Sequence, residues 1–203
     1  MNDATSTDGF SGIPEASTLP IAFQAFHTLH AAEYLIYATS LLYEDDTAQD
    51  LVDEVFAQLA DHWDHVMTQA NPAAYAWALL RRVVEAESKR RKEHLALIQK
   101  HAFSYALRRE FEPILREIDT HAVTDLEIGI TVAAAVLELS GAKLDVILLH
   151  CLNDLGMDKT AAVMGIEPAT VRSLLCQARA KLEVRLAPRR LLRLSSTARA
   201  DEE

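Results

Sequence analysis

The chain has 203 residues, half of them hydrophobic, and a formal net charge of −10. A chain of this length can bury one core or two small ones, so one or two domains are expected. It contains no apolar run long enough to span a membrane, and its first twenty residues lack the basic and hydrophobic regions of a signal peptide. Cys151 and Cys176 lie outside any paired motif, which fits a reducing compartment. We therefore expect a cytoplasmic protein without membrane insertion.

The charge is distributed unevenly along the chain. Residues 1–80 contain 12 acidic residues and no lysine or arginine, so the other 18 acidic residues and all 20 basic residues lie downstream. The basic residues concentrate in two clusters, one within 81–92 and one within 172–193. Such clusters are compatible with nucleic-acid binding by an acidic chain, and a solvated helix face is the alternative interpretation for each.

Nearly all of the chain after residue 20 is predicted to be helical. Strand-like alternation is absent, whereas apolar residues recur at steps of three and four over 21–42, 48–63, 73–99, 123–139, 143–152 and 168–186. We predict an all-α fold of two small helical domains joined by a linker, the second domain containing a helix-turn-helix. The predicted parts are a disordered tail 1–20, a domain 21–100, a linker 101–121, a domain 122–187 and a tail 188–203.

The predicted helix over 48–63 has an acidic face. Its apolar stripe consists of Leu51, Val52, Val55, Phe56, Leu59 and Trp63. Asp50, Asp53 and Glu54 fall outside the stripe and are expected to point outward. These carboxylates suit a basic partner surface, and without further information a solvated acidic face is the simpler interpretation.

The next predicted helix begins at Pro72 and carries the first basic cluster. Its candidate nucleic-acid contacts are Arg81, Arg82, Lys89, Arg90 and Arg91. Tyr75 and Trp77 could stack on bases, but their helical spacing favours packing in the core.

The C-terminal domain has the pattern of a helix-turn-helix. One helix is expected to end near Asn153, and Asp158 can cap a short helix that runs to Met164. Gly165 suits the left-handed position that closes this helix, and Pro168 suits the first turn of the next one. The final helix would therefore be the recognition helix, which lies in the major groove in such proteins.

The recognition helix is predicted to have one buried and one exposed face. Its buried stripe is Val171, Leu174, Leu175, Ala178 and Leu182. Side chains that can contact bases or phosphates lie elsewhere on the helix, namely Thr170, Arg172, Ser173, Gln177, Arg179 and Lys181. An ordinary helical hairpin with a basic exposed side is the alternative.

These segments resemble the extracytoplasmic-function sigma factors of bacterial RNA polymerase. "TVRSLLCQARAKL" is similar to the recognition helix of their region four, the promoter-recognition domain. "AQDLVDEVFAQLADHW" is similar to their region two core-binding helix, and "PAAYAWALLRRVVEAESKRRK" to the helix that captures the minus-ten promoter element. The resemblance covers about residues 21 to 187.

The resemblance implies a sigma factor that binds core RNA polymerase and directs promoter-specific initiation of transcription. Asp50, Asp53 and Glu54 would bind the polymerase, and the exposed residues of the recognition helix would bind the upstream promoter element. The cations from Arg81 to Arg91 would bind the minus-ten region. An anti-sigma factor is a further candidate partner, and neither a cofactor nor an enzymatic activity is expected.

One departure from the family pattern leaves an alternative open. Glu85 and Ala86 stand where relatives commonly have an Arg-Asn pair beside the melted promoter strand. A carboxylate there repels phosphates, so capture of the minus-ten strand is in question. The alternative is a sigma-like interaction protein that engages a regulatory partner of the anti-sigma type and has little promoter activity. The His27/His30 and His62/His65 pairs could in principle hold a metal, but no metal site is predicted.

Overall fold

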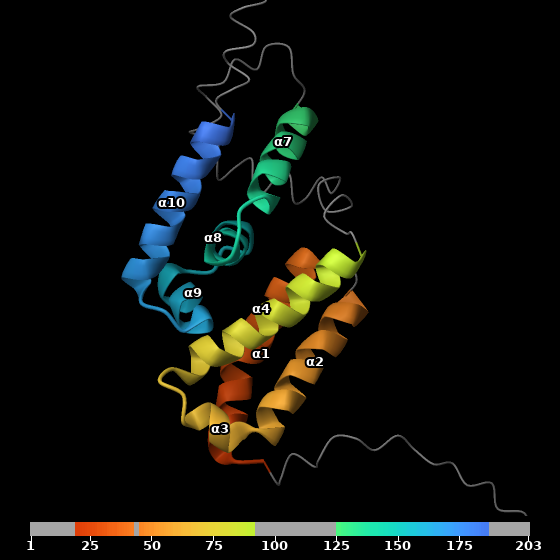
Figure 1. Cartoon of the computed structure of the whole chain (residues 1–203), viewed down its shortest axis with the longest axis vertical. Coiled ribbons are helices and arrows are strands. Elements are labelled where there is room, and N and C mark those ends of the chain that lie inside the picture. The colour runs from red at the N-terminus through yellow and green to blue at the C-terminus, as the bar shows by residue number, and fades with distance from the viewer. Residues whose placement is uncertain (1–18, 43–44, 92–124, 187–203) are drawn as a thin grey trace, which may run out of the picture.

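The computed structural model describes residues 19–42, 45–91 and 125–186, and within them the chain forms only helices and their connections (Figure 1). This confirms the predicted all-α class. The N-terminal helices are α1 (Ile21–Leu41), α2 (Asp45–Asp61), α3 (Trp63–Met67) and α4 (Pro72–Arg91). The C-terminal helices are α7 (Asp125–Leu137), α8 (Ala142–Val146), the π-helix η1 (Ile147–Leu152), α9 (Met157–Met164) and α10 (Pro168–Leu186). The predicted linker and nearly all of the predicted tails lie outside the described residues.

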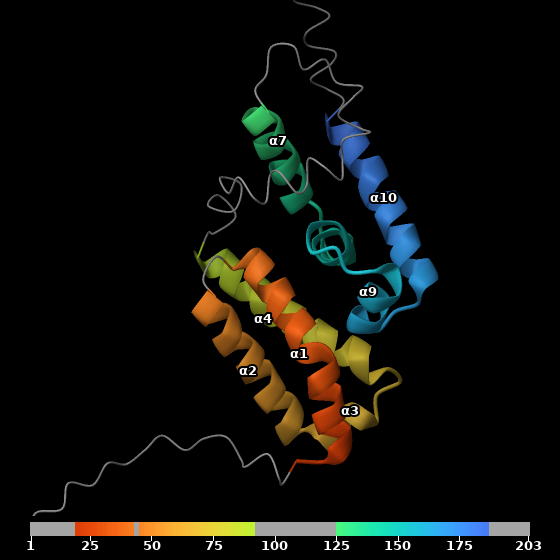
Figure 2. The same ribbon diagram turned by 180° about the vertical axis from the view of Figure 1, so that it is seen from behind.

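The helices α1, α2 and α4 pack side by side, as Figures 1 and 2 show from opposite sides. Their apolar faces bury an aromatic cluster in which the Phe23 ring meets Trp63 edge-on, with 5.2 Å between ring centroids. The predicted helix 48–63 is divided in the structure, because His62 leaves the helical conformation and α3 begins at Trp63. Trp63 is nevertheless buried in the same cluster, as the apolar stripe predicted.

The helix formed by α8 and η1 is surrounded by other helices. It packs against α10 on one side and α1 on another, and all residues from Leu144 to Leu149 are buried. A helix enclosed in this way needs apolar side chains around its circumference, which explains the run "LDVILL". The sequence predicted a regular helix here, whereas the backbone widens to a π-helix from Ile147 onward.

The helix-turn-helix is formed by α9 and α10, as predicted. Gly165 has a φ of +63° and closes α9 in the left-handed conformation, and α10 begins at Pro168. The predicted cap at Asp158 is wrong, because α9 begins at Met157 after Gly156 and has no side-chain cap. Asp158 lies within the first turn, where its negative charge still interacts favourably with the helix dipole.

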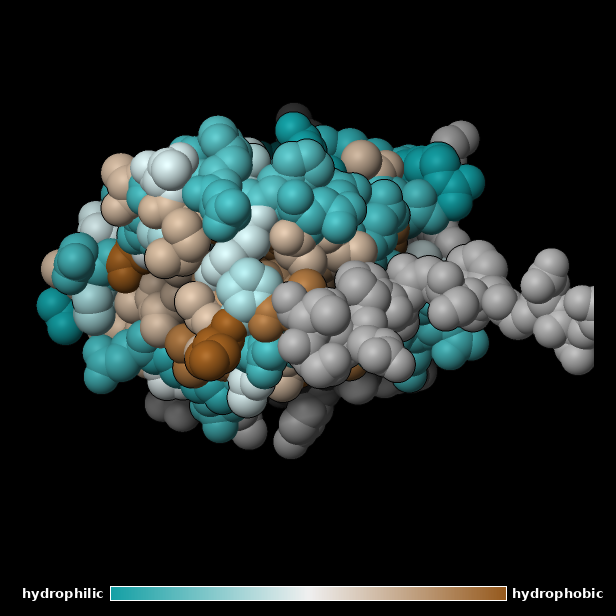
Figure 3. Space-filling view, turned by 90° about the horizontal axis from the view of Figure 1, so that it is seen from below, coloured by the Kyte–Doolittle hydropathy of each residue, from teal (hydrophilic) through white to brown (hydrophobic). Residues whose placement is uncertain are grey.

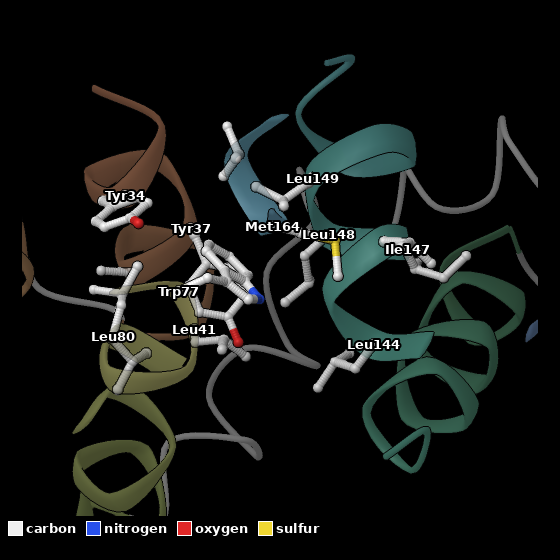
Figure 4. Packing of buried hydrophobic residues seen from close by; sticks show 14 of the residues in the cluster. Tyr34, Tyr37, Leu41, Trp77, Leu80, Leu144, Ile147, Leu148, Leu149 and Met164 are labelled. Carbon is white, nitrogen blue, oxygen red and sulfur yellow. The ribbon is translucent and has the colours of Figure 1, made fainter. Parts of the chain in front are cut away.

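The N-terminal and C-terminal helices share one cluster of buried hydrophobic residues. Figure 4 shows Tyr37, Leu41 and Trp77 from α1 and α4 facing Leu148 and Met164 from the C-terminal helices. The pairs that bring the two groups together are α4 with α9, α1 with η1, and α1 with α9. In this structure, the two groups of helices therefore form one packed body. No helix within the described ranges combines the length and the apolar content required to cross a bilayer.

Candidate nucleic-acid and partner interfaces

The outer face of α10 is polar and accessible. The residues predicted to contact the upstream element, Thr170, Arg172, Ser173, Gln177, Arg179 and Lys181, are all exposed. The opposite face is buried through Val171, Leu175, Ala178 and Leu182, whereas Leu174 of the predicted stripe is only half-buried. The Gln177 amide donates to the Ser173 hydroxyl at 3.2 Å, so these two side chains lie together one turn apart. The helix thus presents cations, an amide and hydroxyls in the combination that contacts base edges and phosphates.

The turn between α9 and α10 lies directly against the start of α4. The Asn71 side chain accepts a hydrogen bond from the Ala74 amide at 3.0 Å, which caps α4, and donates to the Gly165 carbonyl at 2.9 Å. A Cβ atom at Gly165 would lie 2.2 Å from the Ala74 nitrogen. Gly165 is therefore required both for the left-handed turn and for close approach of the two groups of helices.

The predicted minus-ten cations of α4 are arranged along the helix among carboxylates. Arg82, Lys89 and Arg90 are exposed, Arg81 is half-buried, and the Arg91 side chain lies outside the described residues. The Arg90 guanidinium donates from Nε to Glu87 at 2.7 Å. Glu85 lies between Arg81 and Lys89, with 3.7 Å from each cation nitrogen to its nearer carboxylate oxygen. The negative charge at Glu85 is therefore balanced by cations one turn away on either side.

Arg81 also contacts a buried carboxylate of the C-terminal helices. Its Nη1 donates to Oδ2 of Asp145 at 3.4 Å, and the Tyr37 hydroxyl donates to Oδ1 at 3.0 Å. Asp145 belongs to α8, Tyr37 to α1 and Arg81 to α4, so three helices meet at this carboxylate.

Burial changes the titration of this group. Burial raises the pKa of Asp145 to about 6, although the Arg81 guanidinium and the Tyr37 hydroxyl oppose the change. Burial together with the Asp145 charge also raises the pKa of Tyr37 well above its usual value, so the phenol stays protonated as a donor. Asp145 is therefore mostly ionised at neutral pH, and burial of this charge is unfavourable. Protonation of the carboxylate at lower pH removes that free-energy penalty.

Two further polar contacts join the two groups of helices. Lys159 of α9 forms an ion pair with Glu33 of α1. The Asn153 amide, which follows η1, donates to the Ser40 hydroxyl of α1 at 2.8 Å. Sequence reasoning did not single out Glu33, Asp145 or Lys159. The available signal was a lone carboxylate within an apolar helix, since such a carboxylate is buried only with a partner.

The acidic face predicted for α2 is present. Asp50, Asp53 and Glu54 are all exposed on one helix. Asp53 accepts a hydrogen bond from the Gln49 amide at 2.8 Å and Glu54 one from Gln58 at 3.1 Å, so each carboxylate is held by a neighbour one turn away. The face can bind a cationic protein surface without any change in the helix.

Exposed hydrophobic side chains occur on the N-terminal helices as well. They include Ile21, Leu29, Met67 and Tyr75. Figure 3 views the molecule from below and shows hydrophobic residues gathered near the middle of that face, with hydrophilic residues around them. A hydrophobic centre with a polar rim is typical of surfaces that bind another protein.

The aromatic and histidine candidates pack mainly in the protein. Trp77 is buried, with its ring 4.6 Å from that of Tyr37 between centroids, while Tyr75 is partly exposed and contacts the His65 ring. His30 is buried and desolvation lowers its pKa, opposed by the Glu33 charge. Among the described residues, no three His, Cys, Asp or Glu side chains are grouped as a metal site would require.

Comparison with protein families identifies the C-terminal helices. Residues 131–182 match the family described as Sigma-70, region 4, a segment of about a quarter of the chain. The segment includes part of α7, all of α8, η1 and α9, and most of α10. It therefore contains both the helix-turn-helix and Asp145. The match confirms the sigma-factor resemblance that was predicted from the recognition helix.

Comparison with solved structures finds a sigma factor bound to an anti-sigma factor. The structure is similar to a co-crystal structure of the sigma factor RpoE in complex with the anti-sigma factor NepR from Bartonella quintana, with 21% sequence identity and a TM-score of 0.39. The similarity covers 81% of this chain and 96% of that one. No curated protein matches the chain significantly in sequence.

Proposed function

Because residues 131–182 match the family described as Sigma-70, region 4, we propose that the chain is a sigma factor of the extracytoplasmic-function type. It would bind core RNA polymerase and direct it to promoters in the bacterial cytoplasm, and it would carry out no catalytic step itself. The observation that carries the proposal is the exposed polar face of α10 within the region 4 segment. The proposed upstream-element contacts are Thr170, Arg172, Ser173, Gln177, Arg179 and Lys181.

The two other parts of the proposed function rest on the N-terminal helices. We assign polymerase binding to Asp50, Asp53 and Glu54, whose exposure on one helix supports contact with a basic surface. We assign binding of the minus-ten region to Arg81, Arg82, Lys89, Arg90 and Arg91. The exposure of Arg82 and Lys89 supports this second assignment, and the pairing of Glu85 with Arg81 and Lys89 removes part of the expected repulsion.

A second function is favoured by a specific observation. Arg81 is paired with both Asp145 and Glu85, which leaves this cation less available to a DNA strand. A sigma-like protein that engages an anti-sigma type of partner, with little promoter activity, would have no need of a free cation there.

Run-off transcription separates the two functions. The full chain is incubated with core polymerase, tested for co-purification and then supplied with a library of genomic promoter fragments. Transcripts that depend on the chain support the sigma factor. Binding to core polymerase with no transcript from any fragment would contradict it and favour the interaction protein.

Charge reversal tests the polymerase surface. Changing Asp50, Asp53 and Glu54 together to lysine should weaken binding to core polymerase by at least about tenfold at low salt, with a smaller effect at high salt. A matched control reverses Asp154, Asp158 and Glu167, three exposed acidic residues of the C-terminal half. If both triple variants bind core polymerase equally, the α2 face is not the binding surface.

A further inference from the structure

The helix α1 is hydrophobic on both of its sides. Its inner side packs in the core through aromatic and aliphatic residues. Its outer side has a second set of apolar residues, all of them exposed, which we call the α1 stripe: Ile21, Ala22, Ala25, Leu29 and Ala32. Because they recur at steps of three and four, they share one face of the helix. Ile21 and Leu29 are 85% and 64% exposed, and Figure 2 shows α1 on the near side of the N-terminal helices, in front of α4. A helix that is apolar all round is usually covered on every side, so the α1 stripe suits a second protein surface.

The outer side of α1 carries no charged side chain. Within α1 the only aspartate, glutamate, lysine or arginine is Glu33, which is buried and paired with Lys159. The neighbouring helix α2, in contrast, has the exposed acidic face. The chain has a net charge of −10, so two copies repel each other in most orientations. Contact through the α1 stripe brings two copies together without placing a charged side chain of one α1 against the other.

The polar side chains beside the stripe are hydrogen bonded to the backbone of their own chain. The Thr28 hydroxyl donates to the Gln24 carbonyl at 2.9 Å, and the Gln24 amide donates to the Leu19 carbonyl at 2.8 Å. Groups that are paired in this way keep their hydrogen bonds when water is excluded, so covering this side of α1 carries a small desolvation penalty. Burial of Ile21 and Leu29 is therefore a net gain.

Large and small residues alternate along the stripe in a self-complementary way. Ala25 and Leu29 lie one turn apart on the same face. In an antiparallel pair of α1 helices related by a two-fold axis, Leu29 of each copy lies over Ala25 of the other, and Ile21 lies near Ala32. The small residues allow the two helices to approach closely, and the large ones fill the space between them. A surface that fits itself in this way forms an isologous contact.

We propose that the α1 stripe is a dimer interface, on which a second copy of this chain packs antiparallel through the same residues. The stripe extends about 17 Å along the helix, so the contact is smaller than a standard protein interface. The dimer is therefore weak and forms at micromolar rather than nanomolar concentrations. The inference is independent of the proposed function, because no residue of the stripe is assigned to polymerase or promoter contacts.

Sedimentation velocity of the full chain, measured over a range of concentrations, tests the dimer. Leu29→Glu places carboxylates in the centre of the interface and should weaken dimerisation by at least about tenfold. Val184→Glu is the matched control, since it makes the same kind of change at an aliphatic residue of α10 that is 73% exposed and lies outside the stripe. Both positions are exposed, so both variants should fold, and circular dichroism checks this.

Salt distinguishes an apolar contact from an ionic one. Raising the salt concentration screens the repulsion between two acidic chains, so it should strengthen the parental dimer. A dimer held by ion pairs would weaken under the same change.

Mixed cross-linking tests the antiparallel arrangement. Ala25→Cys and Leu29→Cys are prepared as separate proteins, each with Cys176→Ser to remove the exposed native thiol. On oxidation the mixture should give on the order of tenfold more disulfide-linked dimer than either protein alone, because position 25 of one copy lies against position 29 of the other.

Several results would overturn the inference. A parent chain that stays monomeric into the range of several hundred micromolar would do so, as would equal dimerisation of Leu29→Glu and Val184→Glu, or a dimer that weakens at high salt. Equal cross-linking in the mixture and in the separate proteins would show that the copies do not meet in the proposed register. If the parent is monomeric and Leu29→Glu weakens binding to core polymerase, the polymerase covers the stripe in place of a second copy. None of these measurements uses transcription, so the dimer and the proposed function can fail separately.

Discussion

The two helices proposed to contact DNA differ in how much of their charge is available. On α10 the predicted contacts are all exposed, and the buried stripe on the opposite side carries no charge. On α4 the cation nearest the C-terminal helices, Arg81, is shared between Glu85 and Asp145. The α10 surface is therefore accessible to duplex DNA, whereas the Arg81 cation of α4 is already paired with carboxylates of the same chain.

This difference indicates that the two promoter contacts need not form together. A helix whose polar face is exposed can bind a duplex in the packed structure, whereas contact between a DNA strand and Arg81 of α4 competes with the Glu85 and Asp145 carboxylates. The helix-turn-helix would therefore engage DNA whether or not the two groups of helices are packed together, and the minus-ten contact would follow their separation.

A disulfide across the contact should weaken single-strand binding strongly and leave duplex binding intact. The side chains of Ser40 and Asn153 are hydrogen bonded at 2.8 Å, so cysteines at these positions lie close enough to be candidates for a bridge. With Cys151→Ala and Cys176→Ser to remove the native thiols, the oxidised protein should lose single-strand affinity by about a hundredfold or more, because separation is blocked. Filter binding with both kinds of DNA measures this.

The same protein after reduction is the control for the bridge. Reductant should restore single-strand binding to the level of the unbridged parent. Loss of duplex binding in the oxidised form would show that α10 also needs the helices to separate, and the comparison between the two surfaces would then fail.

Two substitutions on α10 should weaken DNA binding in different ways, one at a single base pair and the other on all sequences. Arg172→Ala removes a candidate base contact and should cost on the order of 1–3 kcal/mol at its cognate site, with relaxed specificity at one base pair. Lys181→Ala removes a candidate phosphate contact and should weaken binding to all sequences alike. Binding to a panel of single-base promoter variants distinguishes them. Equal small losses on every sequence would leave α10 with only a nonspecific basic face.

The recognition helix was predictable and the contact between the two groups was not, for a physical reason. Helical periodicity, Gly165 and Pro168 act within one segment, so sequence alone was enough to assign the buried and exposed sides of α10. The pairing of Asp145 with Tyr37 joins residues 108 positions apart, and no local pattern encodes it. The same limit explains the cap wrongly assigned to Asp158, where several residues near the start of α9 satisfied the same local rule.

Acidification should favour the packed arrangement. Asp145 has a pKa of about 6 when buried, against an ordinary value of 3.8. Because the packed state binds the proton more tightly, packing gains stability as the pH falls through 6 toward 4, by about 1.4 kcal/mol or tenfold between pH 7 and pH 5. Acrylamide quenching of Trp77 in a Trp63→Phe background should therefore fall on acidification. The other charged groups at the contact are Arg81 and Glu85 of α4 and the Glu33–Lys159 pair.

Asp145→Asn isolates this effect from the titration of other groups. The amide is isosteric with the carboxyl and has no charge to titrate, so the change in quenching between pH 7 and pH 5 should vanish. A variant that keeps the full pH dependence would assign the effect to another group, and that group could not be His30, because burial lowers the pKa of His30 and its protonation would oppose packing.

The smallest effect is expected at the departure from the family pattern on α4. Glu85 lies 3.7 Å from cation nitrogens of Arg81 and Lys89, so its charge is already largely balanced, and replacing it changes less than the bare sequence suggests. Glu85→Arg with Ala86→Asn restores the family pair, but it also places three cations one turn apart, and their mutual repulsion costs a few tenths of a kcal/mol. We expect promoter opening on a generic minus-ten sequence to rise by only about threefold, with a steeper loss at high salt because one more phosphate is neutralised. Permanganate reactivity of unpaired thymines with core polymerase present measures opening.

Ala86→Asn alone is the matched control and should have little effect on the salt dependence. A chain that opens no promoter until Glu85 is replaced would show that this carboxylate blocks the strand itself, which is the behaviour of the sigma-like interaction protein.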